Sequence, residues 1–358
     1  MNSLKLRTLP LQLIEIDDGV LLKRGNTILN VNGKGAKTAV PLVLSKLNLP
    51  GSTQEEVAQN FSGPEQQAVN QFIEKLISNK LAVTADTPDP QPISQESHLD
   101  IFYWHFGDST GQVTERLNRQ HVTIVGVNHI SRQLSAAFVA SGVDNFEIVD
   151  DPILGNTRML NHKGAYREGI WNGSHQPKPL QEWKNEIDPA LVNCVIATSD
   201  FGGLSLLREW NQFCVDRKIF FMPVVLQDQV GYVGPLVIPG ETACLECLLA
   251  RQDSHRSDSE RSRSIEESAH EGQSVIGFHP SMASILGDLA AFELTKFFSG
   301  VLPGWNVGTI LEINLLSTRM TSRKVLKVPR CPVCSPLLTR TPINPHKAFS
   351  LLPVKDKP

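Results

Sequence analysis

The sequence predicts an α/β protein in which a doubly wound parallel sheet follows a small α+β module. Beyond residue 100, apolar runs alternate with helical patterns, which is typical of parallel strands joined by crossover helices. The expected strands are residues 121–126, 145–150, 192–200 and 219–225. In such a Rossmann-like sheet, ligands bind beyond the carboxyl ends of the strands, where we expect Gly126, Asp150 and Asp200.

A proline-rich segment divides the chain. The 358 residues exceed the length of one typical domain. Pro88, Pro90 and Pro92 lie close together among polar residues, which predicts an extended linker without a core of its own. The expected parts are a first domain, the linker, a second domain and a tail, at residues 1–83, 84–100, 101–335 and 336–358.

The first domain combines strands and helices. Short apolar runs separated by tight-turn residues predict three strands within residues 11–31. Three helical patterns follow, and the first contains Pro41, which must lie in or near its first turn. Thr53 and Glu56 form a capping box for the second helix, and the third begins at Pro64. One apolar face of the third helix consists of Val69, Phe72, Ile73, Leu76 and Ile77. The module is similar to a winged helix-turn-helix.

The composition excludes several function classes. Lys and Arg number 34 against 37 Asp and Glu, for a net charge of −3, which argues against a nucleic-acid partner held by a positive field. No apolar run reaches the ~18 residues that a membrane span needs. The N-terminus lacks the small-residue cleavage site of a signal peptide. We therefore expect a cytoplasmic protein with no membrane partner.

Four of the six cysteines form two C-x-x-C pairs, namely Cys244, Cys247, Cys331 and Cys334. Four thiolates from two such turns can bind zinc tetrahedrally, and a closed set of four leaves no position for substrate, so the expected zinc is structural. The alternatives are two redox motifs or unpaired thiols. Cys194 and Cys214 lie in apolar stretches and are interpreted as small buried hydrophobic residues.

The secondary-structure pattern of the sequence is weaker beyond residue 250. Residues 251–273 contain mixed charges and almost no apolar residues, which is typical of a solvated, mobile loop. The alternative is a lid or crossover loop that orders over a ligand. A helical pattern over residues 284–298 follows, and then two strand-like runs at 307–316 and 323–328.

The loop after the first large-sheet strand is a weak nucleotide signal. A dinucleotide-binding loop needs glycines for the turn and for close approach of phosphate to the helix N-terminus. Gly126 fits, whereas Asn128 and His129 stand where small residues are expected and could obstruct a phosphate. Asp150 follows Gly126 at about the separation in sequence at which the acid that binds the ribose hydroxyls is expected. The alternative is an ordinary strand-to-helix turn.

A series of motifs, in this order, carries a family resemblance: HVTIVG, FEIVDD, CVIATSD, FMPV, GPLVIPGETACLEC and CPVC. They resemble the ubiquitin-activating-enzyme-like (ThiF-like) adenylating family, in its branch of ribosomal peptide natural-product (RiPP) maturation. That branch includes the ThiF-like cyclodehydratase proteins of thiazole/oxazole-modified microcins, in which a winged-helix leader-peptide recognition element precedes the adenylating-type domain. The resemblance covers about residues 10–335, and the paired cysteines with their lead-in are its most specific part.

The resemblance implies a set of adenylation residues. Active members use ATP and magnesium; Asp150 matches their ribose-binding acid and Asp200 their magnesium-associated aspartate. Arg158 and Lys163 would place cations beside the developing phosphate charge, so the catalytic set would be these two residues with Asp200. The remaining matches, in the nucleotide site, are Gly126 and Asn156.

Two function classes remain. In the first, the protein binds the leader of a precursor peptide by strand addition and presents the core peptide to a separate YcaO-type cyclodehydratase for azoline formation. In the second, the protein is itself an ATP-dependent adenylating enzyme that activates a carboxylate of the precursor. The altered loop favours the first. The expected peptide-binding residues lie on an edge strand and the third helix: Ile28, Leu29, Val31, Val69, Phe72 and Ile73.

A DNA-binding regulator is a third, weaker hypothesis. A winged helix would place its third helix in the major groove. That helix, which begins at Pro64, offers few cations to phosphates. The family resemblance also implies a homodimer.

Overall fold

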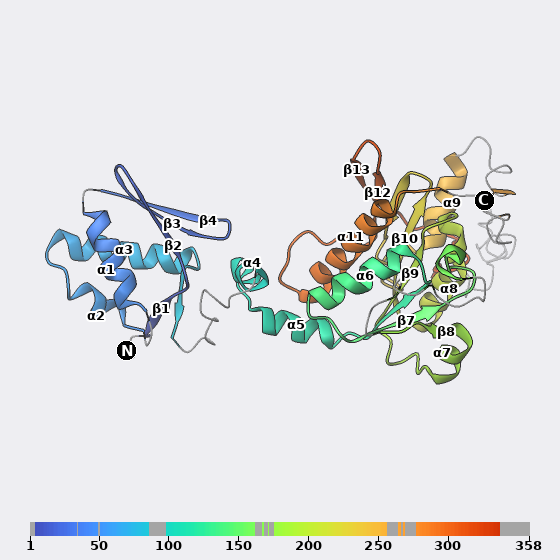
Figure 1. Ribbon diagram of the computed structural model, residues 1–358, viewed down its shortest axis with the longest axis horizontal. Helices are drawn as coiled ribbons and strands as arrows, with labels where there is room; N and C mark the ends of the chain where they lie inside the picture. Colours follow the sequence, from blue (N-terminus) through green and yellow to red (C-terminus); the bar gives the residue numbers. More distant parts are fainter. Residues whose placement is uncertain are drawn as a thin grey trace, which may run out of the picture. The chain divides into compact units, whose positions relative to one another are not determined.

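The structure is a computed structural model, shown in Figure 1. It describes residues 4–33, 35–48, 51–85, 98–161, 167, 171, 175–255, 264–265, 268 and 277–336. Lys163, most of the expected linker, most of loop 251–273 and nearly all of the expected tail lie outside the described residues. The chain forms two compact units, Met1–Glu115 and Arg116–Pro358.

The first unit contains the three strands and three helices that the sequence predicts. An antiparallel sheet has the order β2-β3-β4, and a second, two-stranded sheet pairs β1 with β5. The strands are β1 (Leu6–Thr8), β2 (Gln12–Ile16), β3 (Gly19–Arg24), β4 (Thr27–Asn32) and β5 (Ala82–Thr84). The helices are α1 (Ala36–Lys46), α2 (Gln54–Ala58), α3 (Pro64–Ser78), α4 (His98–Phe106) and, at the unit boundary, α5 (Thr110–Asn118).

The core of this unit lies between the three-stranded sheet and the helices. Val20 and Leu22 of β3 pack in one buried cluster with Val43 of α1 and Ile73 of α3. The capping box is confirmed, since the Thr53 side chain accepts from Glu56 N–H and the Glu56 carboxylate accepts from Thr53 N–H.

Two details of the helices correct the sequence analysis. Pro41 lies in the second turn of α1, not in the first, and has no N–H to donate to the carbonyl of exposed Lys37. Ile77 is 42% exposed and does not belong to the buried face of α3. Leu76 in the same turn is fully buried, so Ile77 lies at the margin of the apolar face, where the helical rotation turns it toward solvent.

The second unit contains the mostly parallel sheet that the sequence predicts. Its order is β13-β12-β11-β10-β9-β6-β7-β8, and the five strands from β10 to β8 are parallel. They are β6 (Val122–Val125), β7 (Phe146–Asp150), β8 (Lys178–Pro179), β9 (Cys194–Ser199) and β10 (Phe220–Gln227). The antiparallel remainder is β11 (Val230–Val233), β12 (Thr309–Asn314) and β13 (Arg319–Lys324).

The last strand differs from its prediction. The expected run 323–328 is displaced, because the chain turns within residues 315–318 and already pairs Arg319 with Asn314. Thr318 takes a positive φ of 53° in this turn. The strand therefore uses the polar residues 319–324, which suit an edge that is exposed on both faces.

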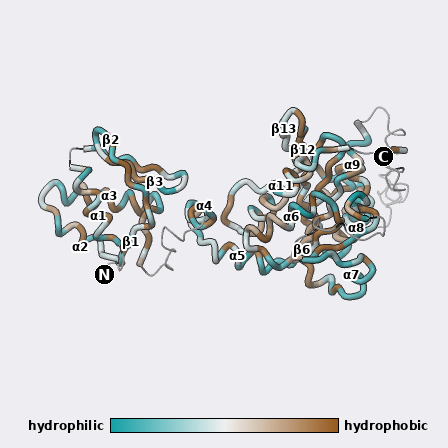
Figure 2. Tube along the Cα trace, in the orientation of Figure 1, coloured by the Kyte–Doolittle hydropathy of each residue, from teal (hydrophilic) through white to brown (hydrophobic). Residues whose placement is uncertain are grey.

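Helices cover both faces of the large sheet (Figure 1). On one face, α8 (Arg208–Arg217) and α9 (Leu245–His255) join a buried cluster with Val195 and Phe221 of the sheet. The other face carries α6 (His129–Ala140) and α11 (Pro280–Ser299), which lie side by side. The central strands are strongly apolar (Figure 2), and among the described residues no helix is long and apolar enough to cross a membrane. The remaining elements are α7 (Leu180–Glu186) and the 3-10 turns η1 (Thr157–Met159) and η2 (Leu204–Leu207).

Helix α11 begins four residues earlier than predicted and depends on one glycine. The His279 side chain accepts from Ser281 N–H and Pro280 occupies the first turn, so the helix starts there. At Gly287, α11 approaches α6 so closely that a Cβ atom would lie 2.8 Å from the Ile130 carbonyl oxygen and 2.9 Å from Leu134 N. These are backbone atoms, which cannot move aside as a side chain can.

The substitution Gly287→Ala should therefore separate the two helices. We expect it to destabilise the second unit by about 1–3 kcal/mol, as overpacking of a close contact does. Differential scanning calorimetry of the full chain measures the effect. Gly277→Ala is the matched control in the same unit, because its Cβ would meet no atom within 4 Å. Equal transitions for the two variants would contradict the assignment of Gly287 as a close-approach glycine.

Candidate functional site

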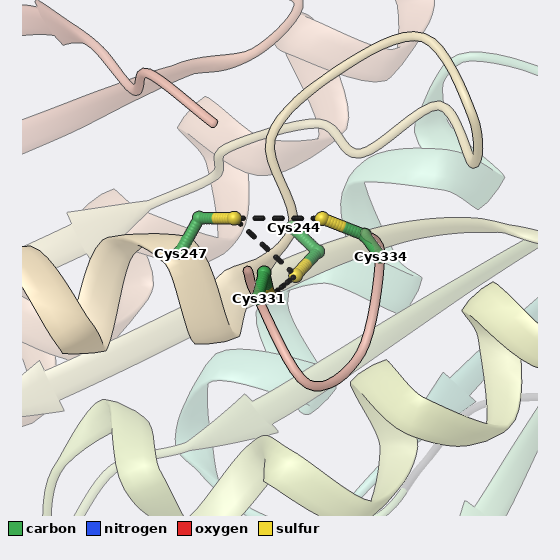
Figure 3. A group of neighbouring side chains, drawn as sticks. All are labelled: Cys244, Cys247, Cys331 and Cys334. Carbon is green, nitrogen blue, oxygen red and sulfur yellow. Dashed lines mark hydrogen bonds between the residues drawn. The ribbon is translucent and has the colours of Figure 1, made fainter. Parts of the chain in front are cut away.

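The four paired cysteines meet in space (Figure 3). Cys244 Sγ lies 3.6 Å from Cys331 Sγ, and Cys247 Sγ lies 3.4 Å from Cys334 Sγ. All four sulfur atoms lie within 4.8 Å of one another. Four sulfurs bound to zinc at ~2.3 Å in a tetrahedron would be about 3.8 Å apart, so these residues could hold such a metal ion.

The fold brings the two pairs together. Cys244 and Cys247 flank the start of α9, and the other pair lies in a turn after β13. The Val328 N–H donates to Cys247 Sγ over 3.3 Å. The neighbouring thiols of Cys244 and Cys334 lower the pKa of Cys247, and the contacts with Cys247 and Cys334 raise the pKa of Cys244.

The other two cysteines have a different environment. Cys194 and Cys214 are fully buried in apolar surroundings. Burial raises the pKa of both thiols, so they stay protonated at neutral pH and are poor metal ligands. Their interpretation as small core residues agrees with this placement.

Substitution of one cluster cysteine should abolish metal binding. We expect Cys247→Ala to lose the single metal equivalent and to lower the thermal stability of the second unit, because the remaining three thiols no longer close a tetrahedral site. Metal analysis of the purified protein, with calorimetry, measures both. Cys214→Ala, a buried control, should keep its metal. A metal-free wild type with unchanged stability would contradict the metal site.

The loop between β6 and α6 is shaped by its own hydrogen bonds. Gly126 has a φ of +95°, and a Cβ there would lie 2.6 Å from the Thr198 carbonyl oxygen. Glycine is therefore required by the approach of β9, whether or not a ligand binds.

Asn128 caps α6 from inside the protein. Its side chain is fully buried, and its Oδ1 accepts from Ile130 N–H and Ser131 N–H, both at 3.1 Å. Its Nδ2 donates to the carbonyl and the hydroxyl of Thr198, at 3.0 and 2.9 Å. Asn128 thus contacts β9 and at the same time occupies two of the α6 N–H groups that a phosphate would otherwise bind.

Asp200 lies at the same helix terminus and is also fully buried. One carboxylate oxygen, Oδ2, accepts from His129 N–H at 2.9 Å. Asn156 Nδ2 donates to both carboxylate oxygens, at 2.9 and 3.0 Å. Burial raises the pKa of Asp200, and the hydrogen bonds from His129 and Asn156 oppose that rise.

These contacts close the helix terminus. The first N–H groups of a helix have no partner within the helix, and they are what a phosphate binds. In α6 the N–H groups of His129, Ile130 and Ser131 all have side-chain acceptors already. A nucleotide phosphate could bind here only after these hydrogen bonds break.

The remaining predicted nucleotide residues are only partly brought together. Asp150 ends β7 and is half-buried, whereas its neighbour Asp151 is buried and accepts from Trp210 Nε1 at 2.7 Å. Arg158 lies in η1 with an exposed side chain, and only its backbone N–H contacts the group, through Asn156 Oδ1.

His129 also belongs to the site. It contributes its backbone N–H, which the sequence analysis did not predict. Its N–H contacts Asp200, and its ring lies edge-on to Phe278. The ring Nδ1 is buried without a hydrogen-bond partner, and burial lowers the pKa of His129. The signal available in the sequence was the Asn-x-x-Ser capping pattern of residues 128–131.

The first unit contains a groove of about 490 Å³ beside β4. Val31 at the end of β4 and Val69 and Phe72 of α3 line it, and α1 contributes Val40 and Val43. Its lining is therefore largely apolar.

The other expected peptide-binding residues lie elsewhere. Ile73 is fully buried in the core of the unit, and Leu29 is half-buried. Ile28 is 60% exposed and lies on the opposite face of the sheet from Val31, because side chains alternate along a strand. Of the six expected residues, Val31, Val69 and Phe72 line the groove.

Comparison with known proteins gives matches only among solved structures. No family model and no curated protein matches the chain. Escherichia coli MccB has 15% identity and a TM-score of 0.64, over 92% of this chain and 97% of MccB. MccB with AMPCPP and MccA gives 16% and 0.65, over 92% and 99%. The heterocyclase TruD gives 16% and 0.58, over 93% of this chain but 43% of TruD.

These similarities concern the fold. At 15–16% identity they confirm the predicted resemblance at the level of the fold, over nearly the whole of this chain. The chain matches MccB along almost its full length and spans less than half of TruD.

Proposed function

We propose that this chain is a RiPP maturation protein that binds the leader of a precursor peptide. It presents the core peptide to a separate YcaO-type cyclodehydratase, which closes Cys, Ser or Thr residues into azolines. The observation that carries the proposal is the apolar groove beside β4, whose outer edge pairs with no strand among the described residues. MccB, which shares the fold, has been solved with MccA, and this supports a peptide partner.

The edge of β4 offers backbone groups for strand addition. Arg24 and Thr27 flank a two-residue turn and form a backbone hydrogen-bonded pair. From Thr27 onward, every second residue of β4 hydrogen-bonds to β3 through its backbone, and the residues between them do not. The N–H and C=O groups of Ile28, Asn30 and Asn32 consequently point away from β3. A leader segment that pairs with them extends the sheet by one strand.

The groove determines which side chains the leader needs. Side chains of an added strand alternate between the two faces of the sheet, so every second one faces the side of Val31. The groove volume of about 490 Å³ lies within the ~300–1,000 Å³ typical of ligand pockets. A leader segment with apolar residues two positions apart fits this apolar lining.

The second unit then acts as a scaffold with structural zinc. The satisfied N–H groups at the start of α6 support a body that binds no nucleotide. The 43% coverage of TruD agrees with a partner that supplies the remaining part of such a heterocyclase. Four thiols with the observed spacing suit zinc. By the family resemblance we also propose a homodimer.

Substitution of Asn30 by proline tests the strand addition. Proline removes the outward N–H of β4 and places a ring at the edge, yet an edge strand tolerates it when that N–H faces solvent. We expect Asn30→Pro to weaken leader binding at least about tenfold, since it removes one backbone hydrogen bond and displaces its neighbours. Calorimetric titration with the leader segment of the cognate precursor peptide measures the affinity.

Glu15→Pro is the matched control. Glu15 lies on β2, the other edge of the same sheet, at an exposed position next to a two-residue turn, so its N–H also faces outward. This variant should bind the leader as the wild type does. Equal affinities for wild type and Asn30→Pro would mean that the peptide does not pair with β4.

A second candidate function is adenylation of a precursor carboxylate by this chain. Asp150, Asn156 and Asp200 occupy the loops beyond the carboxyl ends of β7 and β9, as an adenylating pocket requires. The chain also matches 97% of MccB, which has been solved with AMPCPP. The satisfied start of α6 argues against this function.

Titration with magnesium-ATP separates the two candidates. The scaffold function predicts no binding to the zinc-loaded protein with its precursor peptide present, because phosphate would have to displace Asp200 and Asn128 from the α6 N–H groups. Calorimetry measures binding, and pyrophosphate exchange measures adenylation. Micromolar binding by the wild type that Asp200→Ala abolishes would overturn the scaffold function in favour of the enzyme.

A further inference from the structure

One buried side chain connects α8 with the cysteine cluster. Asn211 of α8 is 1% exposed, and its Oδ1 accepts from Leu245 N–H at 3.0 Å. Leu245 follows Cys244 and is the first residue of α9. Its N–H is among those that a helix leaves without an internal partner, so Asn211 supplies the acceptor that the helix start needs.

The other half of this amide lacks a partner. Asn211 Nδ2 is buried and forms no hydrogen bond with the residues that the structure describes. Exchanging the amide oxygen and nitrogen does not help, because Leu245 N–H requires the oxygen on its side. Buried polar groups are rarely left unpaired, so an unpaired donor beside a ligand set indicates an acceptor that arrives with the ligand.

The cysteine thiols of the adjoining buried cluster are groups that become strong acceptors. Asn211 lies between Trp210 and Cys214 on α8, and these two pack in one buried cluster with Cys244, Cys247 and Cys331. Metal binding converts the four thiols into thiolates, which accept charge-assisted hydrogen bonds. Outer hydrogen bonds of this kind orient metal ligands and increase metal affinity.

We propose that Asn211 is a positioning residue of the metal centre. Its Oδ1 fixes the start of α9 beside Cys244, and its Nδ2 donates to a ligand thiolate. This inference rests on the metal centre proposed above and adds a residue that is not a ligand.

The proposal links the metal centre to the carboxyl edge of the sheet. Helix α8 follows Asp200 after the short turn η2, so a metal that holds α8 also restrains the loop after β9. A second contact between the same helices joins Arg208 Nε to Glu246 Oε2 at 3.0 Å, but the Arg208 side chain is 48% exposed. Solvent weakens such a pair, whereas the Asn211 hydrogen bond is buried.

Three full-length variants test the proposal with zinc and cobalt(II) as probes. Asn211→Ala removes both hydrogen bonds, whereas Asn211→Asp keeps an acceptor for Leu245 N–H and removes the donor. We expect both to lower zinc affinity about 10- to 100-fold in chelator competition and to shift the thiolate-to-cobalt absorption band. Arg208→Gln, the control on the same helix, should change zinc affinity less than about twofold.

The outcomes distinguish this proposal from the metal centre itself. A wild type that binds no zinc refutes the metal centre. The positioning role is refuted if the wild type binds one equivalent of zinc and the Asn211→Ala variant has equal zinc affinity and an unshifted cobalt band. An Asn211→Asp variant with the zinc affinity and the cobalt band of the wild type refutes the hydrogen bond from Asn211 Nδ2 to a thiolate. Asn211 would then act only as the cap of α9. Circular dichroism, with leader binding by the first unit, verifies that each variant is folded.

Discussion

The carboxylate of Asp200 is the constraint around which the carboxyl edge of the large sheet is arranged. It is fully buried, and a buried charge is tolerated only where hydrogen bonds replace the lost water. The donors come from two other loops, as His129 N–H after β6 and Asn156 Nδ2 after β7. Three loops that are distant in sequence are therefore joined at one group, and none can move without leaving a buried charge unpaired.

The same arrangement shows why matching residues do not by themselves establish chemistry. The sequence resemblance matches Asp200 and Asn156 to the magnesium-associated acid and the asparagine of an adenylating enzyme, and here they hydrogen-bond to each other. Asn128, in place of a glycine, provides a cap for α6 that a phosphate would otherwise provide. A helix terminus satisfied by its own protein gains little from an anion.

Patterns with a short physical range were predictable from the sequence. Apolar runs and turn residues predicted β2–β4 and the parallel strands β6, β7, β9 and β10, and the Thr53–Glu56 capping box and the two cysteine pairs were identified correctly. The contact of His129 with Asp200, 71 positions apart, could not be read, because it depends on how β6 and β9 pair. The position of Ile28 on the face opposite the groove could not be predicted for a related reason, since period-two alternation separates the faces of a strand but does not say which one borders a groove.

The two units differ in which backbone, polar and apolar groups can still bind a ligand, and this difference bears on function. Beside β4, outward backbone groups meet an apolar groove, and both gain free energy when an extended peptide covers them. At the carboxyl edge of the large sheet, the strongest donors and acceptors already bind one another. Arg158, the described cation expected to stabilise a phosphate, is exposed there. In the proposed function, the leader binds beside β4 and a partner performs the chemistry, because the first N–H groups of α6 already have side-chain acceptors.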